Sequence, residues 1–77
     1  MKKELADRIV VDSTVLVGKP TIRGLRISVE QVLRALSSGV TPEDILADYP
    51  ELAPEDIRAV LAYAADRVAE DRILHVA

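Results

Sequence analysis

The chain has no cysteine and only one histidine among its 77 residues. The absence of cysteine excludes disulfide bonds and thiolate metal sites. The single histidine, His75, cannot form a metal site alone, because zinc sites use three or four ligands. We interpret it as a solvated residue, and we expect neither a metal nor a cofactor.

Long apolar runs are missing as well. No stretch approaches the roughly 18 residues of a membrane span, and the first residues lack the apolar core of a signal peptide. We therefore expect a soluble, cytoplasmic protein with no membrane contact. A chain of this length buries only about 60% of its unfolded surface. Such small scaffolds need additional stabilisation, so we expect a homo-oligomer, namely a dimer.

Charge is unevenly distributed along the chain. The net charge is −3, yet residues 1–34 carry seven Lys and Arg against four Asp and Glu, and residues 35–77 carry three against nine. One interpretation is an ordinary solvated surface, and the other is that the basic half meets an anionic partner. The negative net charge of the whole chain is unlike that of a strong nucleic-acid binder. It therefore disfavours tight DNA binding by a monomer.

Short β-prone runs occupy the first third of the sequence. Apolar and β-branched residues recur at 8–11, 15–17 and 21–27, separated by polar and glycine positions. They predict a small hairpin or extended β arm over residues 8–27, preceded by a flexible N-terminus at residues 1–7. A β segment this short is not stable on its own. It must therefore pack on the helices or on another chain.

Two helix starts follow the β segment. Ser28 and Gln31 match a capping box, in which the Ser oxygen accepts an amide and the Gln side chain reaches back. Thr41 followed by Pro42 is a second start, since Thr caps and Pro suits the first helical position. Pro50 ends that helix.

Ala53 and Pro54 repeat the start signal for the longest helix, which is predicted to run to about Asp71. Ala53 has no side-chain oxygen for capping, so Ala53→Ser or Ala53→Thr is predicted to stabilise the protein by about 1 kcal/mol. One apolar face is predicted from the helical spacing: Ile57, Val60, Leu61, Ala64, Ala65 and Val68. An apolar tail follows at residues 72–77.

The predicted fold class is mainly α: a short N-terminal β segment followed by a three-helix, helix-turn-helix-like bundle. Residues 8–77 form a single domain with the β arm at 8–27, three helices at 28–71 and the apolar tail. In a helix-turn-helix the start of the last helix enters the DNA major groove. Here that position carries Glu55 and Asp56, and only Arg58 suits a base, so ordinary readout is disfavoured.

The acidic pairs at the helix starts do not predict catalysis. Glu43, Asp44, Glu55 and Asp56 occupy positions where carboxylates stabilise a helix through its dipole, and no histidine or cysteine accompanies them. We expect no enzymatic activity and no catalytic residue.

The basic segment at residues 18–28 is the strongest candidate for a binding site. It contains two of the three glycines and supplies Lys19, Arg23 and Arg26. It is not a Walker loop, because Pro20 stands where Ser or Thr is required. One interpretation is a basic patch for phosphates or a partner's carboxylates; the other is a sharp chain reversal in which Arg26 pairs with an acid of the same fold.

Several motifs together resemble the family called domain of unknown function 433. The resemblance covers roughly residues 8–66 and rests on Gly-Lys-Pro-Thr-Ile-Arg-Gly-Leu-Arg-Ile-Ser at 18–28, Thr-Pro-Glu-Asp-Ile-Leu at 41–46, Tyr-Pro at 49–50 and Pro-Glu-Asp-Ile at 54–57. The resemblance implies a homeodomain-like helix-turn-helix fold. It also implies a kinship with antitoxins of the VapB kind, which pair with PIN-domain ribonuclease toxins.

We therefore expect a non-enzymatic binding module: a VapB-like antitoxin or small transcriptional regulator that binds a PIN-type toxin, operator DNA or both as a dimer. The residues expected to make these contacts are Lys19, Arg23, Arg26 and Arg58. The alternative is a protein–protein interaction module with no role in binding nucleic acid.

Overall fold

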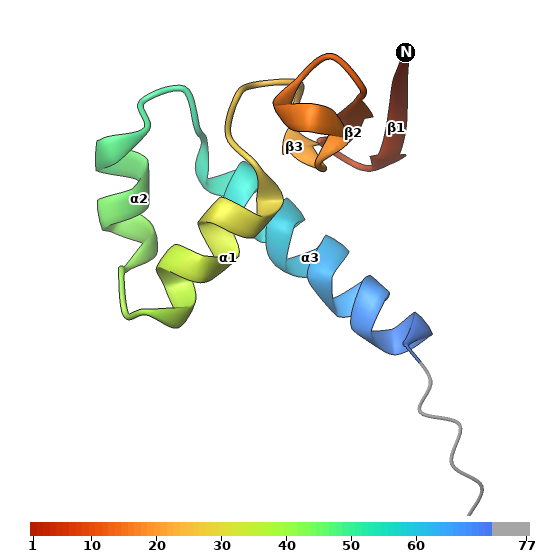
Figure 1. The fold of residues 1–77 in the computed structure, drawn as a ribbon. Helices are drawn as coiled ribbons and strands as arrows, with labels where there is room; N and C mark the ends of the chain where they lie inside the picture. The colour runs from red at the N-terminus through yellow and green to blue at the C-terminus, as the bar shows by residue number, and fades with distance from the viewer. Residues whose placement is uncertain (72–77) are drawn as a thin grey trace, which may run out of the picture.

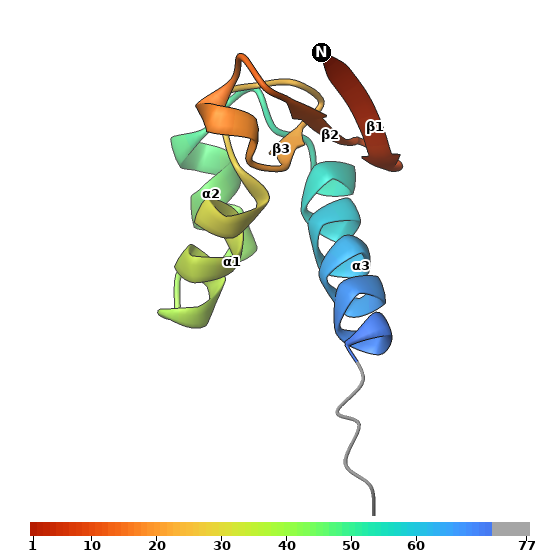
Figure 2. The same ribbon diagram turned by 45° about the vertical axis from the view of Figure 1, so that its right-hand side comes forward.

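The computed structural model describes residues 1–71, which form a three-stranded antiparallel sheet and three α-helices (Figure 1). The sheet lies at one end of the helices in both views (Figure 2). The elements in chain order are β1 (Lys2–Ala6), β2 (Ile9–Asp12), the 3-10 turn η1 (Leu16–Gly18), β3 (Thr21–Ile22), α1 (Val29–Ser37), α2 (Pro42–Asp48) and α3 (Pro54–Glu70).

The first strand is absent from the sequence-based prediction. Residues 1–7 were expected to be flexible, whereas Lys2–Ala6 pairs antiparallel with Ile9–Asp12. The two strands are joined through a turn in which Arg8 takes a φ of 65°. Tight hairpins usually place Gly or Asn at such a position. The missing turn glycine and the charged, exposed residues of β1 explain why the strand gave no signal.

The predicted extended run at residues 15–17 is a turn instead. Leu16 and Val17 take φ values of 49° and 57°, in the left-handed region, and Gly18 follows at 77°. A β-branched residue rarely adopts this conformation. The turn returns the chain to the sheet, where Thr21 and Ile22 pair with β2.

The three helices begin where the sequence predicts. The Ser28 hydroxyl accepts a hydrogen bond of 2.9 Å from the Gln31 backbone N–H, and Thr41 caps α2 in the same way. The second half of the predicted capping box is wrong, because the Gln31 side chain donates to the Tyr49 hydroxyl at 2.7 Å. Gln31 thus connects α1 to the end of α2.

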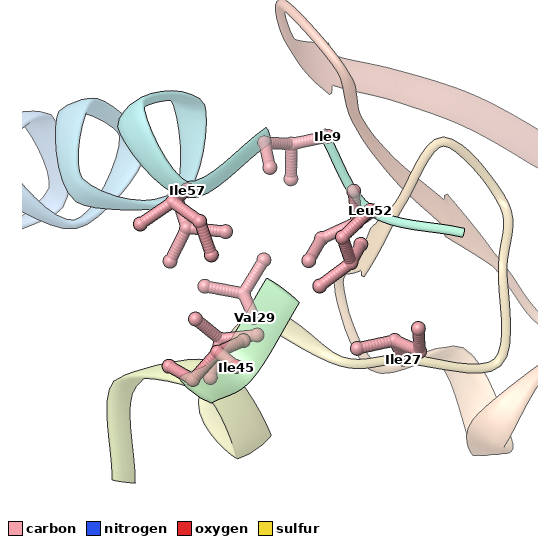
Figure 3. Packing of buried hydrophobic residues seen from close by; sticks show 9 residues of the cluster. Ile9, Ile27, Val29, Ile45, Leu52 and Ile57 are labelled. Atoms are coloured by element: carbon pink, nitrogen blue, oxygen red, sulfur yellow. The ribbon is translucent and has the colours of Figure 1, made fainter. Parts of the chain in front are cut away.

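One hydrophobic core joins the sheet to all three helices (Figure 3). Ile9 and Ile22 from the sheet are fully buried and share the core with these residues of the helices and their linkers: Ile27, Val29, Val32, Ile45, Leu52, Ile57 and Val60. The predicted fold class, a mainly α helix-turn-helix-like bundle with a β arm, is therefore wrong. The strands form a complete sheet whose apolar side chains supply part of the core, and they pack on the helices of the same chain.

The apolar face predicted for the longest helix is only partly buried. Ile57 and Val60 are buried, but Leu61 is 48% exposed and Val68 is 71% exposed. Both views show the end of α3 extending away from the sheet (Figures 1 and 2). The predicted apolar tail, together with His75, lies outside the described residues.

Candidate functional site

The basic segment forms a tight chain reversal. Gly24 takes a φ of 76° and Arg23 a φ of 52°, and the Leu25 N–H donates to the Ile22 carbonyl at 2.8 Å. The Ile22 N–H donates to the Ile27 carbonyl at 3.0 Å, so the chain doubles back within six residues. This geometry is the reversal that the sequence left as one of two interpretations.

Asp56, in the first turn of α3, joins the two turns of the sheet region to the helices. Its side chain is 0% exposed. Arg8 Nη1 lies 2.9 Å from Asp56 Oδ1, and Arg23 donates through Nε and Nη2 to the two carboxylate oxygens at 3.0 and 2.9 Å. The Ala53 backbone N–H donates to Oδ2 at 2.8 Å. The buried carboxylate therefore has four hydrogen-bond donors.

These donors determine the ionisation of the cluster. Burial by itself would raise the pKa of Asp56, but hydrogen bonds from Arg23, the Ala53 N–H and Arg8, together with the charge of Arg23, outweigh burial. They hold the pKa of the Asp56 carboxyl well below its ordinary value. The hydrogen bond to Asp56 raises the pKa of Arg23 in turn. The cluster is fully ionised at neutral pH.

Lys19 belongs to a second, exposed cluster. Its Nζ lies 3.2 Å from Glu30 Oε1, and Arg34 Nε lies 2.9 Å from Glu30 Oε2. Hydrogen bonds from Arg34 and then Lys19 lower the pKa of Glu30. The Glu30 side chain is 48% exposed, so water screens these pairs far more than those of Asp56.

The four basic residues singled out in the sequence do not share one cluster. Arg23 contacts Asp56 and also donates to the Glu51 carbonyl at 2.6 Å, and Lys19 contacts Glu30. Arg58 lies 3.9 Å from Glu55 on its own helix. Arg26 is exposed and forms no salt bridge within residues 1–71. Arg23, not Arg26, is the arginine that pairs with an acid of the same fold.

An acidic surface covers α2 and the loop after it. Glu43, Asp44, Asp48 and Glu51 are exposed, and none of them forms a salt bridge within the part of the chain that the structure describes. We refer to these four residues as the acidic surface. The sequence analysis explained Glu43 and Asp44 by the helix dipole and found the acidic excess of residues 35–77, but it did not show that these four carboxylates lack a salt bridge.

An apolar groove of about 480 Å³ separates the first turns of α2 and α3. Its apolar lining comes from both helices, with one charged side chain on each: Pro42, Glu43 and Leu46 of α2, and Pro54, Ile57, Arg58 and Leu61 of α3. Two helices with a proline at the first position lie side by side here. The repeated start motif in the sequence was the available signal, but only the fold places the two copies together.

The described residues offer little for metal or acid–base chemistry. Within residues 1–71 no group of three or more His, Cys, Asp and Glu side chains is placed to hold a metal ion. No helix in this range is long and apolar enough to span a bilayer. Asp56 is neutralised by two arginines, and Glu55 lies near Arg58.

Sequence reasoning also missed the partnership of Arg8 with Asp56. Forty-eight positions separate the two residues, and Asp56 matched a helix-start pattern that is sufficient to explain a carboxylate there. Nothing in the local sequence distinguishes Asp56 from Asp44, which occupies the same position of α2. The two aspartates differ in burial, because Asp56 is buried and Asp44 is exposed.

Comparison with known proteins identifies the family. A family model described as "Protein of unknown function (DUF433)" matches residues 9–64. No curated protein and no solved structure matches the chain. The chain belongs to the DUF433 family.

Proposed function

We propose that this member of the DUF433 family is a non-enzymatic module that binds a basic protein, and that its partner is a PIN-domain ribonuclease toxin, as for an antitoxin of the VapB kind. One observation carries the proposal. The basic side chains Lys19 and Arg23 are engaged by carboxylates of the same chain, whereas the acidic surface of α2 has no cationic partner within residues 1–71.

The charge of this surface fits the expected partner. A ribonuclease attracts RNA, a polyanion, and its substrate-binding surface is correspondingly rich in Lys and Arg. Glu43, Asp44, Asp48 and Glu51 present four carboxylates to solvent. Complementary charge accelerates encounter and selects among partners. An acidic module that covers a basic nuclease surface also competes with RNA for it, which is a direct way to inhibit the enzyme.

The partner is tested by co-expression with the product of the neighbouring reading frame. We expect a nuclease that co-purifies with this chain and is inhibited by it, with an association rate that falls as salt rises. A neighbour that is no nuclease, together with nothing retained on the tagged chain, contradicts the antitoxin role.

The acidic surface is tested by neutralising Asp48 and Glu51 together. Asp48→Asn with Glu51→Gln should slow association with the nuclease several-fold and flatten its salt dependence, because surface charges act mainly on the association rate. The matched control is Glu4→Gln with Asp7→Asn, which removes the same two charges from exposed positions of the β1 region. Equal effects of the two pairs would show that net charge, and not this surface, governs binding.

Operator DNA is a second candidate partner, favoured by the exposed cations that lack an internal salt bridge. Arg26, Lys2 and Lys3 are exposed and make no salt bridge within residues 1–71. A mobility shift with the upstream DNA should weaken steeply with salt if phosphates are contacted. Lys2→Gln with Arg26→Gln is the informative variant, because Arg23 also supports the fold and its replacement would confuse unfolding with lost binding. Unchanged mobility of DNA at every concentration favours a module that binds protein alone.

A further inference from the structure

β1 forms one edge of the sheet, and its outer side has no partner strand among the described residues. The strand order is β1-β2-β3, and both views show β1 on the outside of the sheet (Figures 1 and 2). Lys2, Lys3 and Glu4 are exposed and form no salt bridge within residues 1–71. An uncovered edge offers its backbone donors and acceptors to another strand.

The pairing of β1 with β2 determines which backbone groups face outward. The Ser13 N–H donates to the Met1 carbonyl at 3.2 Å, and Lys3 follows in the same register. Because hydrogen-bonded and non-hydrogen-bonded positions alternate in an antiparallel pair, the peptide groups of Met1 and Lys3 point toward β2. The N–H and C=O groups of Lys2 and Glu4 therefore point to the free edge.

We propose that β1 pairs antiparallel with β1 of a second copy of this chain, with the twofold axis at Lys3. In this register Lys2 lies opposite Glu4 of the second copy, and the symmetry repeats the pair. The outward N–H and C=O groups of the two residues exchange both hydrogen bonds in each pair. The sheets of the two copies thereby become one continuous antiparallel sheet.

The side chains are complementary in this register. Lys2 and Glu4 point to one face of the sheet, because alternate residues of a strand share a face. Opposite charges directly across two strands attract, and each Lys2 meets a Glu4 of the other copy. Lys3 meets Lys3 at the axis, on the other face. This is the one pair of like charges, and it limits the affinity of the dimer.

The face that carries Lys3 packs on the helices. Lys3 lies opposite Val11, and Ala6 lies opposite Ile9 of the core; Val11 and Ile9 share a face because they are two positions apart. Leu5 and Ala6 line a hollow of about 180 Å³ on this side of β1. The rest of its lining comes from α3: Tyr63, Asp66, Arg67 and Glu70.

Met1 of the second copy reaches the edge of this hollow. The register brings it level with Leu5, on the face that carries Lys3. Met1 is 94% and Leu5 38% exposed, so their contact removes apolar surface from water on both chains. The dimer thus adds apolar burial to the backbone hydrogen bonds and the charge pairs.

Other twofold registers lack these complements. An axis at Glu4 would set Glu4 against Glu4 and would pair Lys2 with Ala6, which lies beyond the irregularity in the β1–β2 register. An axis at Lys2 would set Lys2 against Lys2. A parallel pair would place every residue opposite itself, so like charges would meet at all three charged positions. The edge therefore fits a second copy in one register.

A mixing experiment tests the charge pairs. In sedimentation the unchanged chain should approach twice its monomer mass of 8.4 kDa as its concentration rises. Lys2→Glu and Glu4→Lys should each raise the dimer dissociation constant about tenfold, because each brings like charges together. An equimolar mixture of the two should associate more tightly than either variant alone, since every acid at positions 2 and 4 then meets a lysine. Asp7→Lys is the matched control, because residue 7 is exposed but lies past β1.

Crosslinking tests the position of the axis. Because the chain has no cysteine, Lys3→Cys introduces a single thiol. The Cα atoms of a non-hydrogen-bonded pair are about 4.5 Å apart, which is within the range of a disulfide, so mild oxidation should link the dimer. Glu4→Cys should stay unlinked, because its thiol would meet Lys2. Lys3→Thr should lower the dissociation constant several-fold by removing the like charges at the axis.

Each outcome decides the proposal. A monomeric mass throughout the micromolar to millimolar range, a mixture that associates no more tightly than its components, or crosslinking of Glu4→Cys as readily as Lys3→Cys overturns it. Circular dichroism shows whether each variant is folded, and the crosslinking result decides where a charge variant is not. All measurements use this chain alone. The nuclease and DNA experiments are carried out below the dimer dissociation constant, so that their Glu4 and Lys2 variants act on those partners only.

Discussion

Two carboxylates in this molecule each hold two basic side chains, and they differ chiefly in burial. Asp56 binds Arg8 and Arg23 and is 0% exposed, whereas Glu30 binds Lys19 and Arg34 and is 48% exposed. Both connect the N-terminal region to a helix. The same pattern of one carboxylate between two cations is therefore a structural support at Asp56 and a solvated surface feature at Glu30.

Burial matters because it removes water as an alternative partner. The carboxylate of Asp56 cannot be left unpaired without a large cost, whereas Glu30 can exchange its cations for solvent. The backbone reflects this difference. Arg8 and Arg23 both take left-handed conformations, with φ of 65° and 52°, which are unfavourable for side chains other than Gly and Asn. The ion pairs with Asp56 help to hold both turns in place.

The largest effect is expected from Asp56→Ala. This change leaves Arg8 and Arg23 without their carboxylate and the Ala53 N–H without its acceptor, and it should lower the free energy of unfolding by about 3 kcal/mol, near the lower limit for breaking a buried ion pair because both arginines remain partly solvated. Urea unfolding at pH 7 measures it. A loss no greater than that of Glu30→Gln would remove the distinction between the two clusters.

The dependence of stability on pH should also reveal the contribution of the buried Asp56 cluster. The pKa of Asp56 lies below the value of about 3.9 expected in the unfolded chain. Its stabilisation is therefore complete above that unfolded-state pKa and is lost as the pH falls through it toward the folded-state pKa. Between about pH 5 and pH 2 the free energy of unfolding should fall more steeply for the unchanged protein than for Asp56→Asn. Parallel curves from thermal melts across this range would contradict the assignment.

A smaller gain should come from completing the cap beside Asp56. Ala53 supplies its N–H to Asp56 but has no side-chain hydrogen bond to α3. Ala53→Ser adds an acceptor for the first turn and should stabilise the protein by about 1 kcal/mol without disturbing the cluster. Thermal melting measures the gain, with Ala69→Ser, in the exposed last turns of α3, as the control that should show none. Equal behaviour of the two serines would rule out a capping effect.

The smallest effect is expected from Glu30→Gln. Water screens exposed ion pairs and offers both partners alternative contacts, so this substitution should lower the free energy of unfolding far less than Asp56→Ala does. The difference should also shrink in 1 M salt, where the screening length falls to about 3 Å. Urea unfolding at two salt concentrations checks both points. A loss comparable to that of Asp56→Ala, insensitive to salt, would mean that Glu30 supports the fold as Asp56 does.

Local signals in the sequence located the helices and the strands β2 and β3, but neither β1 nor the turn at residues 16–18. The caps at Ser28 and Thr41 and the prolines at 42 and 54 act within one helical turn, so their pattern can be recognised without the fold. The turn that joins β1 to β2 carries Arg8 in place of glycine, and Val17 occupies a left-handed position that its β-branched side chain disfavours. These elements are held by long-range contacts, which local pattern cannot reveal.

The candidate binding surfaces could likewise be predicted only in part from the sequence. The sequence singled out four basic residues for contacts with a partner or nucleic acid, namely Lys19, Arg23, Arg26 and Arg58. Two of them meet carboxylates of the same chain, 11 and 33 positions away. The sequence also placed Leu61 and Val68 on one apolar face with Ile57 and Val60, which are buried while the first two are exposed. Helical spacing defines which residues share a face, but not how much of that face the rest of a small domain can cover.

By itself the sequence determined where the helices begin, which residues can cap them and which family the chain resembles, because those properties depend on neighbours along the chain. The tertiary structure decided that the β segment completes a sheet, that Asp56 is buried while Glu30 is not, and that the acidic surface and the side of α3 with Leu61 and Val68 are exposed. These outcomes depend on desolvation, and the degree of desolvation is set only when distant segments pack together.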